Sequence, residues 1–305
     1  MGVLDEILET KRGEVAFLRE PQRRAALERA AGEASPARDF AGALRREDGC
    51  VAVIAEIKRR SPSKGELASN LDPALTARAY EAGGASALSV LTDTPYFGGS
   101  LEDLRAARSA THLPVLRKDF TIDPVQIYEA RAAGADAILL IVAALPDGGL
   151  LADLHALARE LGLAALVEVD DDSGLDRALG IPGVEIVGVT NRDLRTFDED
   201  LSVAERIAAR IPAAVIAVAE SAIRTPADAQ RMADAGFAAV LVGEALVRAS
   251  DPTAAVHDLA AVLRDPARGI GGDEGAVREA LRVLRHLRRA EVDADEARDA
   301  ARRQA

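Results

Sequence analysis

The chain has 305 residues, 49% of them hydrophobic, and a formal net charge of −12 with a pI near 5.0. This acidic balance argues against nucleic acid or an anionic membrane as a partner, because a negative field repels both. The one cysteine excludes an intrachain disulfide, and the four scattered histidines lack metal-ligand spacing, so we expect no metal. We expect a cytoplasmic protein, since the N-terminus does not resemble a signal peptide and no apolar run reaches the roughly 20 residues of a membrane span.

The first elements expected along the chain are helices at residues 3–18, 25–31 and 40–46, and we assign residues 1–50 to an N-terminal helical extension. From residue 51 onward, short apolar runs rich in β-branched residues alternate with helical stretches. The runs are hydrophobic almost throughout, as strands buried on both faces are. They lie at residues 51–57, 87–92, 115–118, 137–142, 164–169, 186–189, 214–219 and 239–243.

The segments between these runs carry helix start signals, and Ala-Gly pairs end several of them. Eight such β–α units within residues 51–265 predict the α/β class and a (β/α)8 TIM barrel. An open doubly wound sheet is the alternative, but its Gly-x-Gly-x-x-Gly signature does not follow the first strand. The start signals are Asp72-Pro73, Ser100, Asp123-Pro124, Thr225-Pro226 and Asp251-Pro252.

Residues 266–305 are expected to form a C-terminal tail. A Gly-rich link at residues 268–272 precedes a segment, 274–289, whose leucines at 281, 284 and 287 have helical spacing. The rest of the tail is charged. The tail helix is either a partner-binding element or a segment that packs loosely on its own domain or is disordered.

Lysine is rare in this chain, since only four of the 38 basic residues are lysine. Lys58 and Lys118 each lie at the end of an apolar run. An ammonium is a compact charge that can lose its proton when desolvated, whereas a guanidinium cannot. We therefore interpret these two lysines as proton donors or carboxylate anchors, the alternative being two surface lysines.

Other polar residues also fall at strand ends, where TIM barrels place their chemistry. Glu56 and Lys58 are two residues apart and share one face of the first strand. Glu168 ends the fifth strand inside an apolar run, and its burial is costly unless a cation such as Lys58 or Lys118 pairs with it. Such a cluster separates the pKa values of its members and so supplies both an acid and a base. The alternative is a set of structural salt bridges at the barrel rim.

Two further features of these strand ends indicate the kind of substrate. The ends of strands seven and eight commonly bind phosphate in barrels, and Ser221, Ala222, Gly243 and Glu244 precede helix starts there. We expect only the backbone of Glu244 to contribute, because its carboxylate would repel phosphate. Phe97 and Phe120 follow strand ends and suggest a planar aromatic substrate, with core filling as the alternative.

Together these residues resemble the indole-3-glycerol phosphate synthase family. The opening signature contains Glu56, Lys58 and the sequence Ser61-Pro62-Ser63. The resemblance spans roughly residues 3–264, and the pattern as a whole is specific although no single piece is. The matching segments are residues 54–63, 96–100, 114–120, 134–136, 139–142, 166–169, 191–194 and 219–221.

The resemblance implies a substrate and a reaction. The substrate is 1-(2-carboxyphenylamino)-1-deoxyribulose 5-phosphate, a small phosphorylated aromatic aminosugar. The ring carbon attacks the ribulose carbonyl, carbon dioxide and water leave, and an indole forms. No cofactor is needed, and we expect a monomer or a weak homo-oligomer.

The resemblance also implies roles for individual residues. Lys118 matches the lysine that protonates the carbonyl oxygen during ring closure. Glu168 matches the glutamate that acts as an acid–base catalyst in the dehydration. Lys58 matches a contact to the substrate's anionic groups, with Glu56 beside it. Arg192 and Glu220 match polar positions of the catalytic rim. The substrate-pocket positions are Ser61, Pro62, Phe97, Phe120, Leu139 and Thr190, and the phosphate positions are Ser221, Ala222, Gly243 and Glu244.

Two positions depart from the family pattern. Thr190 replaces an asparagine, and Asn191 cannot substitute because adjacent strand residues face opposite sides. Ala222 replaces a glycine, which matters if the backbone there needs a positive φ. These departures leave two alternatives to an authentic synthase. One is a paralogue acting on a modified aminosugar phosphate in specialised metabolism, and the other is a catalytically weak barrel that serves as a binding subunit.

Overall fold

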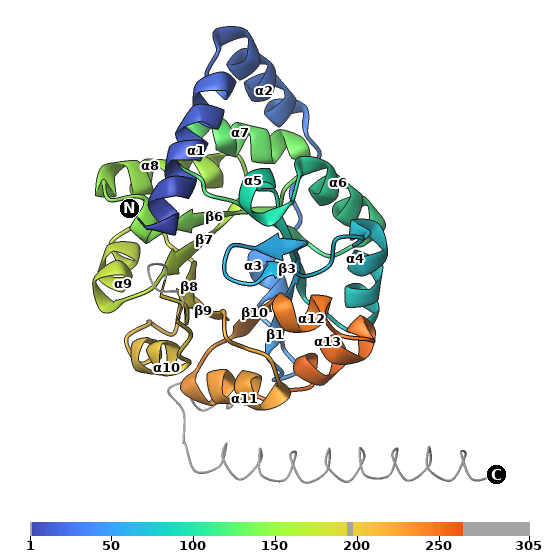
Figure 1. The fold of residues 1–305 in the computed structure, drawn as a ribbon. Helices are drawn as coiled ribbons and strands as arrows, with labels where there is room; N and C mark the ends of the chain where they lie inside the picture. The colour runs from blue at the N-terminus through green and yellow to red at the C-terminus, as the bar shows by residue number, and fades with distance from the viewer. Residues whose placement is uncertain (1, 194–197, 265–305) are drawn as a thin grey trace, which may run out of the picture. The chain divides into compact units, whose positions relative to one another are not determined.

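The computed structural model describes residues 2–193 and 198–264. Within them, eight parallel strands close into a barrel in the order β1-β10-β9-β8-β7-β6-β5-β4 (Figure 1). The closed barrel confirms the predicted (β/α)8 fold. Its strands are β1 (Ala52–Ile57), β4 (Ala87–Leu91), β5 (Val115–Lys118), β6 (Ala137–Ile141), β7 (Ala164–Val169), β8 (Ile186–Thr190), β9 (Ile216–Glu220) and β10 (Ala239–Val242).

The hydrophobic runs of the sequence follow from burial on both faces of each strand. On β1, Ile54 points into the barrel interior, where it joins Leu116, Leu139 and Leu166 in one apolar cluster. Its neighbour Val53 instead belongs to the larger cluster between the strands and the surrounding helices. Because successive side chains alternate between these two apolar environments, every strand position tolerates a hydrophobic residue.

The helices around the barrel begin where the start signals predicted. Asp72, Ser100, Asp123, Thr225 and Asp251 each accept a backbone N–H bond as the N-cap of the following helix. These caps begin α4 (Pro73–Ala82), α6 (Leu101–Ala110), α7 (Pro124–Ala133), α11 (Pro226–Ala235) and α13 (Pro252–Ala260). The remaining helices of the ring are α8 (Gly148–Glu160), α9 (Asp172–Leu179) and α10 (Ser202–Ala208).

Three helices precede the barrel. Helix α1 (Val3–Leu18) has the predicted bounds, whereas α2 (Pro21–Glu33) is longer than predicted because Pro21 begins it as its first residue. Helix α3 (Phe40–Ala43) is shorter than predicted, since the amides of Leu44 and Arg45 bond to carbonyls three residues back and end it. Helix α2 packs against α7 (Figure 1). The division into an extension at 1–50 and a barrel at 51–265 stays a prediction.

The sequence patterns did not predict four short elements. They are the hairpin of β2 (Arg60–Ser61) and β3 (Gly65–Glu66), α5 (Thr94–Phe97), the 3₁₀ turn η1 (Val142–Ala144) and α12 (Glu244–Val247). Each follows a barrel strand and so lies at the carboxyl ends of the strands. The predicted tail, 266–305, and its helix lie outside the described residues.

No helix in the described part of the chain combines the length and apolar character needed to cross a bilayer.

Candidate active site

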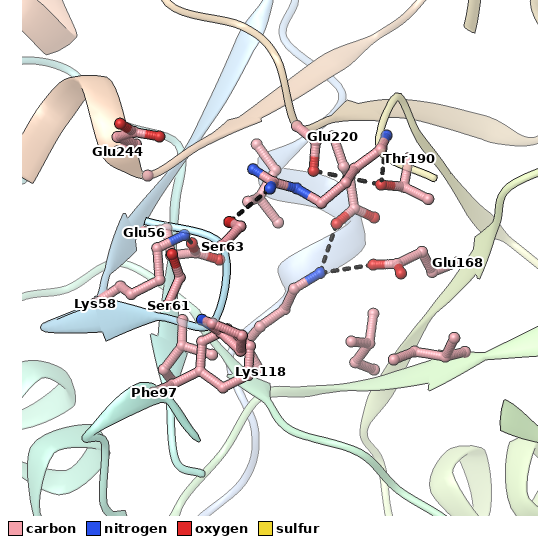
Figure 2. A pocket seen from close by; sticks show the side chains of 18 of the residues that line it. Glu56, Lys58, Ser61, Ser63, Phe97, Lys118, Glu168, Thr190, Glu220 and Glu244 are labelled. Carbon is pink, nitrogen blue, oxygen red and sulfur yellow. Dashed lines mark hydrogen bonds and ion pairs between the residues drawn. The ribbon is translucent and has the colours of Figure 1, made fainter. Parts of the chain in front are cut away.

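A pocket opens at the carboxyl ends of the barrel strands, and every site residue predicted from the sequence lines it (Figure 2). Each of the eight barrel strands, or the loop after it, contributes at least one of those residues. The predicted residues it brings together are Glu56, Lys58, Ser61, Pro62, Phe97, Lys118, Phe120, Leu139, Glu168, Thr190, Arg192, Glu220, Ser221, Ala222, Gly243 and Glu244.

Lys118 lies at the centre of the polar part of the pocket. Its Nζ is 2.8 Å from Oε2 of Glu168 and 2.6 Å from Oε2 of Glu220 (Figure 2). Burial opposes the charge on Lys118, but Glu168, Glu220 and Glu56 outweigh it and raise the pKa of the ammonium. The predicted pairing with Glu168 is present, and Glu220 is a second partner that the strand patterns alone did not indicate.

Glu220 is a carboxylate of the site with a strongly raised pKa. Burial, opposed by Lys118 and reinforced by Glu168, raises its pKa from 4.5 to about 8. Its Oε1 is buried without a hydrogen-bond partner among the described residues. Gly188 on β8 leaves room for this oxygen, because a Cβ there would lie 2.1 Å from it. Near neutral pH, Glu220 therefore holds a proton that it can share with Glu168.

Lys58 pairs with Glu56 rather than with Glu168. Its Nζ is 2.5 Å from Oε1 of Glu56, and Ser89 donates to the other carboxylate oxygen at 3.3 Å. Burial opposes ionisation of Glu56, but Lys58 and Lys118 outweigh it and lower its pKa. Gly243 makes room for this pair, since a Cβ there would lie 2.5 Å from Oε1 of Glu56. Lys58 therefore lies at the pocket wall in an ion pair with Glu56.

An apolar wall faces these charges. The rings of Phe97 and Phe120 have centroids 6.1 Å apart and are tilted by 37°, a favourable arrangement for an aromatic pair. Leu139 contributes to the same surface, and so do residues of α1 and of three strands that the sequence patterns did not assign to the site. The residues of α1 are Val3, Leu4 and Ile7, and those of the strands are Leu91, Ile141 and Leu241.

Thr190 and Asn191 face opposite sides, as expected for adjacent strand residues. Thr190 lines the pocket, donates to Oγ of Ser221 at 3.3 Å, and accepts from the amide of Arg192 at 3.3 Å. Asn191 instead faces outward, donating to the carbonyl of Glu220 at 3.0 Å and accepting from the amide of Ala204 at 3.1 Å. The amide of Asn191 thus ties β8 to β9 and α10 and cannot replace the family asparagine in the pocket.

The expected phosphate positions form a turn after β9 and another after β10. Ser221 and Ala222 have φ values of 64° and 62°, so both non-glycine residues occupy the left-handed region. In the described part of the chain, the backbone amides of Ser221, Ala222 and Glu244 donate no hydrogen bond. The Glu244 carboxylate is 3.3 Å from Nε of Arg248, and the backbone role of Glu244 in phosphate binding stays a prediction.

Arg192 joins two loops at the mouth of the pocket. It donates to Oγ of Ser63 at 2.7 Å and pairs with Glu199, which also pairs with Arg224. Sequence reasoning missed Ser63, Glu199 and Arg224, because they lie beyond the strand ends where no periodic pattern marks them. A sequence feature could have indicated the α1 residues of the pocket wall. The apolar positions of α1 lie on one helix face, and such a face packs against the rest of the protein.

Comparison with known proteins agrees with this geometry. The family model described as indole-3-glycerol phosphate synthase matches residues 4–259. The indole-3-glycerol phosphate synthase of Laribacter hongkongensis is 50% identical over 260 residues, which cover 84% of this chain and 98% of that protein. The synthase of Mycobacterium leprae is 51% identical over 257 residues, covering 84% and 93%.

A third relative is indole-3-glycerol phosphate synthase 1 of Streptomyces coelicolor, which is 49% identical over 271 residues, or 88% of this chain and 98% of that protein. All three matches run through most of both chains, as does the family model. On these grounds, and with a closed eight-stranded barrel holding the matching side chains in one pocket, the chain belongs to the indole-3-glycerol phosphate synthase family.

Proposed function

We propose that this pocket converts 1-(2-carboxyphenylamino)-1-deoxyribulose 5-phosphate into indole-3-glycerol phosphate, with the residue roles given below. Family membership supports the overall activity, that of a carboxy-lyase of tryptophan biosynthesis acting on a small phosphorylated substrate. Ring closure releases carbon dioxide and water, and no electrons are gained or lost overall. The chemistry therefore needs proton donors and acceptors and an anion site rather than a redox cofactor.

The observation that carries the proposal is the position of Lys118 between Glu168 and Glu220. Lys118 is proposed to donate a proton to the ribulose carbonyl oxygen as the ring carbon attacks. Glu168 is proposed to take and return protons in the dehydration. Glu220, which is protonated near neutral pH, keeps the cluster from accumulating negative charge when the anionic substrate enters.

The two ends of the pocket suggest how the substrate is oriented. The phosphate is proposed to lie against the backbone amides of Ser221, Ala222, Gly243 and Glu244. The aromatic ring then lies at the Phe97–Phe120 wall, and Lys58 contacts the substrate's anionic groups. Arg192 is placed at the mouth, where it contacts the loop that carries Ser61 and Pro62 through Ser63.

A direct assay tests this proposal. The full-length protein is incubated with the carboxyphenylamino-deoxyribulose phosphate, and indole absorbance is followed. Turnover that Lys118→Met abolishes and Lys64→Met retains supports the proposal, because Lys64 lies on the exposed turn between β2 and β3 and does not line the pocket. Absence of indole formation by the unmodified protein contradicts it.

We further propose that the protein works in the cytoplasm as a monomer or weak homo-oligomer. Multi-angle light scattering over a range of concentrations tests the assembly state. A stable dimer at low concentration contradicts it.

A further inference from the structure

Lys11, the first of the four lysines along the chain, is buried where a lysine is costly. It lies on α1, on the helix face that also carries Ile7, Leu8 and Val15, and its side chain is only 2% exposed. Its Nζ is 2.9 Å from Oδ1 of Asp119 and 3.0 Å from Oδ2 of Asp93. An ammonium so buried persists only when its partners compensate the lost hydration.

Each of these two aspartates accepts hydrogen bonds from the backbone next to one of the two phenylalanines of the pocket. Asp93 accepts from the amides of Tyr96 and Phe97 at 2.7 and 3.2 Å and so caps α5. Asp119 accepts from the amide of Phe120 at 2.8 Å and directly follows Lys118. A single ammonium therefore contacts the carboxylates that fix the backbones of both Phe97 and Phe120.

The two carboxylates depend on Lys11 to different degrees. Asp119 is also held by Arg117 at 3.2 Å and by the hydroxyl of Thr92 at 2.5 Å. Asp93 is fully buried, and its Oδ2 has no hydrogen-bond partner, so the ion pair with Lys11 is its charge compensation within the described residues. Loss of the ammonium would leave the cap of α5 as a buried, uncompensated charge.

Helix α1 has a second attachment to the same place. The hydroxyl of Thr10 is 2.9 Å from that of Tyr96, and the Tyr96 hydroxyl donates to the carbonyl of Glu6 at 3.2 Å. These contacts bring Leu4 and Ile7 of α1 to the pocket wall.

We propose that Lys11 is a positioning residue that ties α1 to the ends of β4 and β5 and so sets the spacing of the Phe97–Phe120 wall. It touches neither the proposed reacting atoms nor the Lys118 cluster. Its effect is therefore on affinity for the aromatic part of the substrate and not on proton transfer. The inference rests on the substrate orientation given under the proposed function.

The test compares Lys11→Met with Arg12→Met, its neighbour on α1, which is exposed and pairs only with Glu9 within the described residues. Lys11→Met should raise KM at least about tenfold while kcat falls less than about threefold and keeps its pH profile. Arg12→Met should change neither constant. Unchanged KM in a folded Lys11→Met, or an altered kcat–pH profile, overturns the inference.

Two competitive inhibitors separate this inference from the proposed orientation. Indole-3-glycerol phosphate carries the ring, and inorganic phosphate does not. Lys11→Met should weaken inhibition by the ring-bearing ligand at least about tenfold and leave inhibition by phosphate unchanged. If Phe97→Leu leaves inhibition of the otherwise unmodified protein by the ring-bearing ligand unchanged, the orientation is wrong. If Phe97→Leu weakens it and Lys11→Met does not, only the role of Lys11 is wrong.

A second variant covers the case in which Lys11→Met fails to fold. Lys11→Met combined with Asp93→Asn removes both charges, while the asparagine oxygen can still cap α5. This double variant should fold and still show the raised KM, because no ammonium then ties α1 to both strand ends and only the Tyr96 contacts remain. A KM equal to that of the unmodified protein in the folded pair overturns the inference.

Discussion

Two buried lysines differ in what surrounds their carboxylate partners. Lys11 pairs with the half-exposed Glu14 and with two buried aspartates, Asp93 and Asp119, which also bind backbone amides. Asp119 further binds Arg117 and Thr92. Burial opposes ionisation of Asp119, yet Arg117, Lys11 and Thr92 lower its pKa to about 2. The partners of Lys118 line the pocket, and burial raises the pKa of Glu220 to about 8.

The difference shows how the same ion pair serves structure in one place and chemistry in another. Where hydrogen bonds satisfy a carboxylate, its proton affinity is low and it stays charged throughout the useful pH range. Where a carboxylate shares one cation with another carboxylate and lacks other partners, its proton affinity is high and a proton can move. The predictions below test this distinction at the Lys118 side.

The largest effect is expected from Lys118→Met. It removes the proposed proton donor and leaves Glu168 and Glu220 facing each other without a cation. General acid catalysis of this kind contributes about 10²–10⁴-fold, so kcat should fall by at least about 10²-fold. Steady-state indole formation measures this. Retained activity contradicts the assigned role.

The next effect concerns the pH dependence of catalysis. Because Glu220 loses its proton near pH 8, kcat/KM should fall as pH rises through that value. Glu220→Gln cannot ionise, so its residual activity should lack this decline. An identical alkaline decline in both proteins assigns it to another group.

The same group should affect stability, with the sign set by its raised pKa. Between its ordinary value of 4.5 and the raised value of about 8, Glu220 is protonated in the folded chain and ionised in the unfolded chain. Its contribution is therefore fully present below pH 4.5 and lost as pH rises through about 8. Urea unfolding at pH 5 and pH 9 should show a larger loss of unfolding free energy for the unmodified protein than for Glu220→Gln.

A smaller effect is expected at Thr190. Thr190→Asn exchanges the hydroxyl that bonds Ser221 for the side-chain amide that the family resemblance implies at this position. One ordinary hydrogen bond, about 1 kcal/mol, changes an equilibrium or rate constant about fivefold. We therefore expect kcat/KM to change by less than about fivefold. A much larger gain in indole formation indicates that Thr190 serves a different substrate.

The smallest effect is expected at Ala222. A φ of 62° costs about 1–2 kcal/mol for a residue with a Cβ, and glycine avoids this strain. Part of that gain is lost, because glycine has more conformational freedom in the unfolded chain. Ala222→Gly should stabilise the protein by about 0.5–1 kcal/mol in urea unfolding. The control Ala261→Gly, at a φ of −83°, should destabilise it.

The fold was predictable because its signals are local. Most strand positions are hydrophobic, and capping residues such as Asp72 and Thr225 mark helix starts without reference to the rest of the chain. The bounds of α1 followed from its periodicity in the same way. The hairpin after β1 and the four-residue α5 were missed because they are too short to show a period, and contacts with the barrel top hold them.

Site membership was also predictable, since parallel strands in a closed barrel bring their carboxyl ends together. Pairing within the site was predicted only in part. The pairing of Lys118 with Glu168 was expected, whereas its contact with Glu220 depends on side-chain directions across the non-adjacent strands β5 and β9. That Lys58 pairs with Glu56 on its own strand end, rather than with Glu168, also depends on side-chain direction. The space for Glu220 comes from Gly188, a residue that no motif marks.

By itself, the sequence determined the order of β and α units, the strand-end position of the acids and lysines, and membership of one family. Periodicity, caps and motif residues are properties of the chain read locally. Only the tertiary structure decided that Lys118 faces the pocket while Lys11 connects α1 to the strand ends. It also decided which glutamate has the raised pKa. Those outcomes depend on burial and on charges brought together from distant parts of the chain, as with Lys11 and Asp119.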